Sequence, residues 1–170
     1  MTIFYHYTSA ESLFGIGVHG LTVGDVPTDI RKGRGVVGVW LTTSEGSEGH
    51  GLGGRRDKRR YRLSVELPED AANLHSWQAW SSRYATAETI ETLHGVADGW
   101  PTWWIFLGVI KPNQIVGCYD TQDGKPVSDW QNIVTEESKS AVVPPWRREA
   151  WQKKMLKQVS KALQKHRAGA

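Results

Sequence analysis

The chain has 170 residues, a formal net charge of +3, nine tryptophans and one cysteine. This length allows one domain with a hydrophobic core, and the lone Cys118 excludes an internal disulfide framework and a Cys-rich zinc site. No apolar run approaches the roughly 20 residues of a membrane helix, and the first residues do not resemble a signal or transit sequence. We therefore expect a cytoplasmic protein without a membrane span.

The first predicted element is a strand over residues 3–7, which are rich in β-branched and aromatic side chains. Thr8 and Glu11 have the spacing of a capping box, so Thr8 is predicted to cap a helix. Leu13 and Ile16 then lie on one face of that helix.

A polar loop follows, and a second apolar strand is predicted over residues 36–41 before a glycine-rich loop. Residues 61–67 alternate between apolar and polar side chains, which predicts a strand with one wet face that stops at Pro68. Trp77, Trp80 and Tyr84 have the spacing of one helical face.

A further helix is predicted over residues 86–94, and two late strands over 103–107 and 114–119. Residues 120–145 read as polar and irregular, and the segment from 146 to about 166 as an amphipathic helix. These elements predict an α+β domain with a mainly antiparallel sheet and flanking helices.

Charge divides the chain unevenly. From residue 144 onward there are eight basic residues and one acid, a charge of +7, which leaves 13 basic and 17 acidic residues, a charge of −4, for residues 1–143. We therefore predict a domain over 1–143 and a basic C-terminal helix over 144–170 packed on it by its apolar stripe. Basic side chains in this tail and in a cluster near residue 60 are candidate nucleic-acid contacts: Arg55, Arg56, Arg59, Arg60, Lys153 and Lys157. The alternative is that these charges only keep the surface solvated.

Three segments resemble, in order, the ADP-ribosyltransferase-like fold. Tyr5-His6-Tyr7-Thr8-Ser9 resembles the His-x-Thr/Ser opening of RNA 2′-phosphotransferases and of DNA-targeting ADP-ribosyltransferase toxins. Gly38-Val39-Trp40-Leu41-Thr42 is similar to the strand that covers nicotinamide in many members, and residues 104–115 resemble the late strand, Ile-Pro turn and final strand. The resemblance implies a split sheet, NAD or a related nucleotide as ligand, and transfer of ADP-ribose to a nucleic acid or a protein.

The resemblance also implies a site. His6 would orient the nicotinamide ribose, Trp40 would form an aromatic wall, and neighbouring groups would contact the nucleotide: Tyr7, Thr8, Ser9, Thr42, Thr43 and Ser44. The helix that follows would favour a nearby phosphate. The alternatives are that His6 is a strand-end histidine satisfied by a carbonyl, and that Trp40 is a core residue.

One expected residue is missing. NAD-using members place a glutamate at the start of the late strand, where this chain has Thr102, Trp103 and Trp104. The carboxylate could instead come from Glu45 or Glu48, or from one of three further acids, Glu66, Glu136 and Glu137.

Two other functions remain open. An RNA 2′-phosphotransferase needs no glutamate and would hold phosphate with Arg34, Arg55, Arg56 or Arg62, although the second His-x-Arg signature of that family is missing. The second open function is that of a non-catalytic protein of the same fold that binds a nucleotide or a nucleic acid. His50, in a glycine-rich loop, reads as a surface residue, and the histidines show no paired spacing for a metal.

Overall fold

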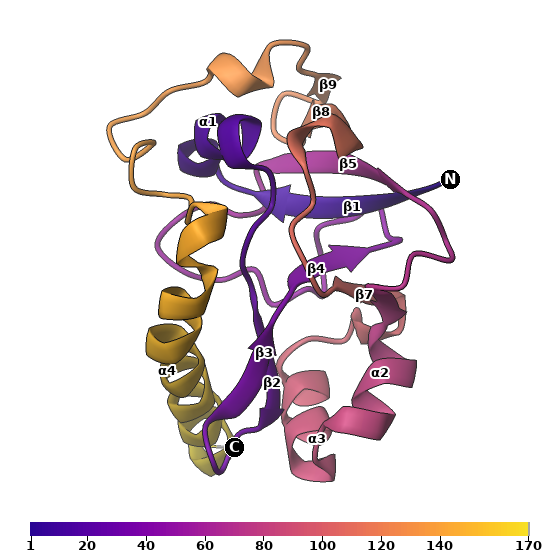
Figure 1. Cartoon of the computed structure of the whole chain (residues 1–170), viewed down its shortest axis with the longest axis vertical. Helices are drawn as coiled ribbons and strands as arrows, with labels where there is room; N and C mark the ends of the chain where they lie inside the picture. Colours follow the sequence, from indigo (N-terminus) through magenta and orange to yellow (C-terminus); the bar gives the residue numbers. More distant parts are fainter. Residues whose placement is uncertain (170) are drawn as a thin grey trace.

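A seven-stranded antiparallel sheet forms the centre of the computed structural model, which describes residues 1–169 (Figure 1). In spatial order its strands are β6 (Leu74–Ser76), β7 (Trp103–Phe106), β4 (Val39–Thr42), β1 (Thr2–Thr8), β5 (Tyr61–Leu67), β8 (Ile115–Asp120) and β9 (Lys125–Pro126). Every neighbouring pair is antiparallel. The predicted α+β class with a mainly antiparallel sheet is confirmed.

The sheet opens between β1 and β4. These strands share one register pair, Tyr5 opposite Thr42, whereas β1 stays paired with β5 from Thr2 to Thr8. Beyond Tyr5 the β6-β7-β4 half and the β1-β5-β8-β9 half therefore separate. This fork is where the candidate site lies.

Helices cover the sheet and create two hydrophobic clusters. α1 (Ala10–His19) places Leu13 and Ile16 against Phe4 and Leu63 in the first cluster. The second is rich in tryptophan and surrounds Trp77, which starts α2 (Trp77–Tyr84). The other helical segments are α3 (Ala87–Val96), η1 (Trp100–Thr102), η2 (Pro112–Gln114), η3 (Trp130–Asn132), η4 (Pro145–Arg147) and α4 (Arg148–Gly169).

The start of α1 differs from the prediction. Ser9, not Thr8, is the N-cap residue, and its side chain makes no capping hydrogen bond. Thr8 remains in β1, where it pairs with Tyr61. The capping box of Thr8 and Glu11 is therefore wrong, because pairing with β5 extends the strand by one residue.

The strand predicted over 36–41 is two strands, β3 (Arg34–Val37) and β4, separated by Gly38. β3 pairs with β2 (Asp25–Asp29) in a separate two-stranded sheet, within the region predicted as a polar loop. A Cβ at Gly38 would lie 3.1 Å from side-chain carbons of both Leu107 and Val26. The crowding explains why a glycine stands at the crossing.

Helix α4 lies along the β2–β3 hairpin, with α3 beside its far end (Figure 1). Leu156 is 5% exposed, and a Cβ at Gly35 would lie 3.1 Å from its Cδ2 atom. The predicted C-terminal helix is thus present, and its apolar stripe faces the hairpin. Within residues 1–169 no helix has both the length and the apolar character needed to cross a membrane.

Candidate functional site

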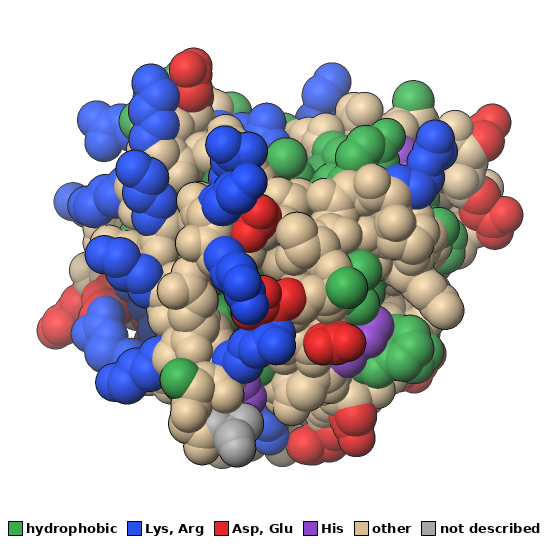
Figure 2. Space-filling model, turned by 90° about the horizontal axis from the view of Figure 1, so that it is seen from below, with side chains coloured by type: hydrophobic (Ala, Val, Ile, Leu, Met, Phe, Trp, Pro, Cys, Tyr) green, Lys and Arg blue, Asp and Glu red, His purple; other side chains and the backbone are tan. Residues whose placement is uncertain are grey.

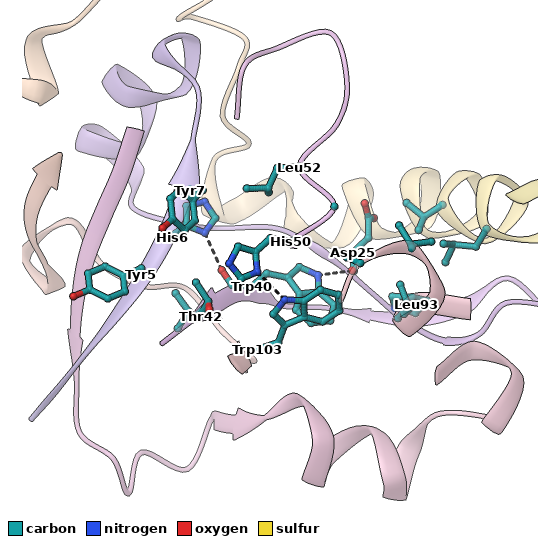
Figure 3. A pocket seen from close by; sticks show the side chains of 17 residues that line it. Tyr5, His6, Tyr7, Asp25, Trp40, Thr42, His50, Leu52, Leu93 and Trp103 are labelled. Carbon is teal, nitrogen blue, oxygen red and sulfur yellow. Dashed lines mark hydrogen bonds between the residues drawn. The ribbon is translucent and has the colours of Figure 1, made fainter. Parts of the chain in front are cut away.

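A cavity of about 320 Å³ opens at the fork between β1 and β4 (Figure 3). Both halves of the sheet, the hairpin, α3, α4 and the loop after β4 contribute to its wall. The lining residues are Tyr5, His6, Tyr7, Asp25, Pro27, Trp40, Leu41, Thr42, His50, Gly51, Leu52, Leu93, Val96, Ala97, Trp103, Val159 and Leu163. Most of these side chains are apolar or aromatic, so the few polar groups among them define its chemistry.

After the pair of Tyr5 and Thr42, β1 and β4 form no further backbone pair within the described residues. The side chain of His6 contacts β4 at this point instead. Its Nδ1 atom is 2.9 Å from the carbonyl oxygen of Trp40 (Figure 3). Since a carbonyl only accepts, Nδ1 carries the hydrogen and Nε2 is left as an acceptor. Burial lowers the pKa of His6, which favours the neutral ring.

Trp40 is held by its neighbours on the hairpin and the tryptophan cluster. Its Nε1–H donates to the carbonyl oxygen of Asp25 at 2.7 Å, and its ring lies 5.1 Å from that of Trp77 and 5.5 Å from that of Trp103. The indole is therefore both a packed core group and part of the cavity wall. Its packing agrees with the core alternative, and its contact with nicotinamide stays a prediction.

His50 also lines the cavity, although it was predicted to be a surface residue. The Trp103 indole N–H donates to its Nδ1 at 2.9 Å, so its Nε2–H donates to the Gly46 carbonyl, also at 2.9 Å. The ring stacks on Tyr7 with centroids 5.8 Å apart. Burial lowers the pKa of His50, so the cavity contains two histidines that favour the neutral form.

The only signal in the sequence for this placement is the pair of glycines on either side of His50. Gly49 and Gly51 have φ values of +76° and +65°, a backbone region that favours glycine. The Gly49 carbonyl also accepts from the Gly99 N–H at 2.7 Å, which ties the loop to the segment before η1. A turn bounded by two such glycines can direct the intervening side chain inward.

Asp25 is the carboxylate in the wall, and the sequence did not indicate it. Its Oδ1 atom is inaccessible and has no hydrogen-bond partner within residues 1–169. Burial raises the pKa of Asp25 to about 6, and the charge of Lys58 opposes this effect. Near neutral pH the cavity therefore holds a carboxylate that lacks a full set of partners.

The residues predicted to contact a nucleotide divide into two groups. Tyr7 and Thr42 line the cavity, and the Thr42 hydroxyl lies 2.8 Å from that of Thr102. Thr8, the last residue of β1, and Ser9, the N-cap of α1, are buried and do not line the cavity. Thr43 and Ser44 also lie outside the wall. The Ser44 carbonyl accepts from the Tyr7 hydroxyl at 3.3 Å, so Ser44 supports a lining residue.

The two acids predicted to be catalytic lie outside the cavity. The Glu45 carboxylate accepts from the Tyr5 hydroxyl at 3.0 Å, and its side chain is 70% exposed. Glu48 faces Arg59 on the surface at 3.4 Å. Both acids follow β4 in the sequence, but they lie on the surface. The carboxylate that lines the cavity is that of Asp25, which belongs to the hairpin.

Most of the predicted arginine cluster is paired with acids. Arg55 and Arg56 contact Glu137 at 3.0 and 2.8 Å. Arg60 donates two hydrogen bonds to Asp120, at 2.9 and 2.8 Å, and lowers the pKa of that carboxyl to about 2. These guanidinium groups are thus occupied by protein carboxylates.

The predicted lysines on α4 are more open. Lys157 is exposed, and Lys153 is exposed with only Glu149 nearby at 3.9 Å. Figure 2, seen from below, shows Lys and Arg side chains gathered on the side that carries α4. These lysines are separate from the cavity, whose α4 wall is formed by Val159 and Leu163.

A scan against protein-family models, a search of curated proteins and a search of solved structures each found no match to this chain. The chemistry of the cavity is therefore the starting point for its function.

Proposed function

We propose that the cavity binds the nicotinamide-ribose end of NAD, and that the protein is an ADP-ribosyltransferase-like enzyme acting on a nucleic-acid or protein acceptor. One observation carries the proposal: His6 and Trp40, from two separate segments of the resemblance, line the same cavity together with an underpartnered carboxylate. The neutral His6 ring retains an acceptor at Nε2, which suits a ribose hydroxyl.

The size and lining of the cavity support one end of a dinucleotide. Its volume of about 320 Å³ is near the lower end of the range for ligand pockets, so it would enclose part of NAD and leave the rest outside. The nicotinamide ring of NAD is planar and cationic. Aromatic faces such as those of Trp40 and Tyr7 attract a cation, and the Asp25 carboxylate adds a negative charge.

Asp25 would take the role of the missing glutamate. In the proposed reaction the bond between C1′ of the ribose and the nicotinamide nitrogen breaks, and nicotinamide leaves with the bonding electron pair. An acceptor oxygen or nitrogen then forms a bond to C1′ and loses its proton to a base. A carboxylate near the ribose stabilises the positive charge that develops at C1′, and a pKa near 6 lets Asp25 accept that proton near neutral pH.

The structure gives less support to an RNA 2′-phosphotransferase. None of Arg34, Arg55, Arg56 and Arg62 belongs to the cavity wall within the described residues, so the expected phosphate clamp is missing there. The third possibility is a nucleotide- or nucleic-acid-binding protein without activity, and its nucleotide-binding form differs from the proposal only in turnover.

Calorimetry with NAD, nicotinamide mononucleotide and ADP-ribose tests the proposal. We expect NAD and the mononucleotide to bind, and His6→Ala to weaken both by about tenfold or more, because it removes a polar group that orients the ligand. His75→Ala is the matched control, since His75 lies on β6 and outside the wall. Unchanged affinity in a folded His6→Ala protein would reject this cavity as the NAD site.

Activity separates an enzyme from a binding protein. With labelled NAD and a mixture of nucleic-acid and protein acceptors, we expect Asp25→Asn to lower the transfer rate by about 100-fold and to weaken ligand binding much less. If the wild-type protein binds NAD but releases no nicotinamide with any acceptor, the transferase part of the proposal fails and the binding part stands.

A further inference from the structure

A second hollow of about 640 Å³ lies between α1 and the start of α4, and it shares no lining residue with the first. One wall is the outer face of α1, with Phe14 and Val18. The other is formed by the chain near Val142 and by Trp151 in the first turns of α4. The proposed NAD site makes no use of this groove.

Contacts centred on Thr22 attach one wall of the groove to the chain that follows α1. The Thr22 hydroxyl donates to the Val143 carbonyl, and the Arg148 side chain donates to the Thr22 carbonyl at 2.7 Å. A Cβ at Gly15 would lie 2.6 Å from Cβ of Val142, so this segment rests directly on α1. A groove fixed in this way loses little conformational entropy when it is filled.

Apolar side chains are unusually exposed along the groove. Val18 is 56% exposed and Phe14 37%, and at the rim Trp146 is 76% exposed with its ring edge-on to His19 at 5.4 Å. Exposed apolar patches of this kind mark interaction sites, and tryptophan is enriched among residues that dominate binding energy.

The Lys and Arg residues that line the groove have no acidic counterpart among the described lining residues. Lys139, Arg147 and Lys154 line it and are exposed, and none forms an ion pair in the part of the chain that the structure describes. The lining in the described residues includes no Asp or Glu. An occupant with negative charges beside an apolar surface would complement both features.

We propose that this groove binds an acidic amphipathic segment of a partner protein, with apolar residues on the floor and carboxylates toward Lys139, Arg147 and Lys154. The lining joins Phe14, Val18, Val142 and Trp151 into an apolar surface, which suits the apolar face of an amphipathic helix. A second copy of this chain would bring its own lysine-rich α4 toward the same cations. The observations therefore favour an acidic peptide over a nucleic acid or a second copy.

Fluorescence anisotropy tests the proposal with a labelled helical peptide that has leucines on one face and glutamates on the other. We expect Trp146→Ala to weaken binding about tenfold, since it removes an exposed aromatic anchor. The double variant Arg147→Glu with Lys154→Glu should weaken it about tenfold or more, and raised salt should also weaken it. Lys161→Glu, exposed on α4 but outside the groove, is the control and should leave affinity within about twofold.

Three results would overturn the proposal. A peptide with lysines in place of the glutamates could bind as well as the acidic one. Single-stranded oligothymidylate could displace the acidic peptide and bind more tightly, which would assign the groove to nucleic acid. A concentration-dependent dimer that Trp146→Ala abolishes would assign it to a second copy. Circular dichroism of each variant checks that the fold is retained.

Discussion

Asp25 stands in a mostly apolar wall, where an ionised carboxyl lacks the water that would solvate it. Its Oδ1 atom finds no hydrogen-bond donor in the described residues, while the Asp25 backbone carbonyl accepts from Trp40. The backbone thus fixes the residue in place and leaves its side chain underpartnered. Such an arrangement costs stability, because a buried polar group without a partner is desolvated and not compensated.

The pH dependence of stability measures this cost. The pKa of Asp25 is raised from 3.8 to about 6 on folding, so between these values the folded state holds the proton more tightly than the unfolded state. The contribution of Asp25 to the free energy of unfolding therefore falls as pH rises from about 4 to about 6. Asp25→Asn, which cannot ionise, should exceed the wild type by about 1 to 2 kcal/mol at pH 7.5 after allowance for partial exposure.

Urea denaturation at pH 4 and pH 7.5 checks this expectation. The advantage of Asp25→Asn should be clearly smaller at pH 4, where the wild-type carboxyl is protonated in the folded state and only partly ionised in the unfolded state. An equal advantage at the two pH values would show that the benefit comes from packing and not from ionisation.

At the residue scale, the sequence indicated some groups of the candidate site and missed others. The motifs singled out His6 and Trp40, and both line one cavity. Asp25 was not predicted, because β2 contains Pro27 and several polar residues and therefore does not have the sequence pattern of a strand. Glu45 was chosen instead, because proximity to β4 in sequence does not reveal on which side of the sheet the loop runs.

Elements were predictable where one periodicity persisted. The alternation over residues 61–67 gave β5 with the observed bounds, because its neighbours on both sides keep one face buried. The prediction of a single strand over 36–41 is wrong, because the chain passes at Gly38 from the hairpin to the central sheet. The residues before Gly38 pair with β2 and those after it pair with β7. The local sequence pattern does not indicate this change of pairing partner.

The contact between the hairpin and α4 gives a test at this scale. At Gly35 a Cβ would lie 2.6 Å from the Val26 carbonyl oxygen and 3.1 Å from Leu156 Cδ2, so a methyl group must displace backbone or the helix. We expect Gly35→Ala to lower the free energy of unfolding by about 1 to 3 kcal/mol. Gly53→Ala, where nothing lies within 4 Å, is the matched control and should change stability little.

Thermal denaturation followed by circular dichroism compares the two variants. Equal melting temperatures for Gly35→Ala and Gly53→Ala would mean that the hairpin and Leu156 tolerate a methyl group at Gly35. Val159 and Leu163 of α4 line the cavity. Displacement of this helix should therefore also weaken the binding of any ligand in the cavity.

Across the whole molecule, tryptophan and histidine form a shared network. The indole of Trp103 donates to His50, and that of Trp77 donates to Nε2 of His94 at 3.1 Å. His94 also stacks on Trp100 at 4.0 Å. Each accepting nitrogen must be unprotonated, so protonation would place two N–H groups against each other. The tryptophan-rich core therefore depends on neutral histidines.

This dependence predicts how stability responds to mild acid. Burial lowers the pKa values of His6, His50 and His94 below 6.5, so as pH falls through 6.5 the unfolded state binds protons that the folded state does not. The three histidines should therefore lower the free energy of unfolding from pH 7.5 to pH 5.5, whereas the single carboxyl of Asp25 acts in the opposite direction. Replacing His50 and His94 together by glutamine keeps an acceptor for each indole but removes the titrating ring, and should reduce the fall while His6 continues to contribute. His75→Gln, on β6, is the control. The double variant could instead lose as much stability as the wild type between pH 7.5 and pH 5.5. That result would exclude the hydrogen bonds between indole and histidine as the origin of acid sensitivity.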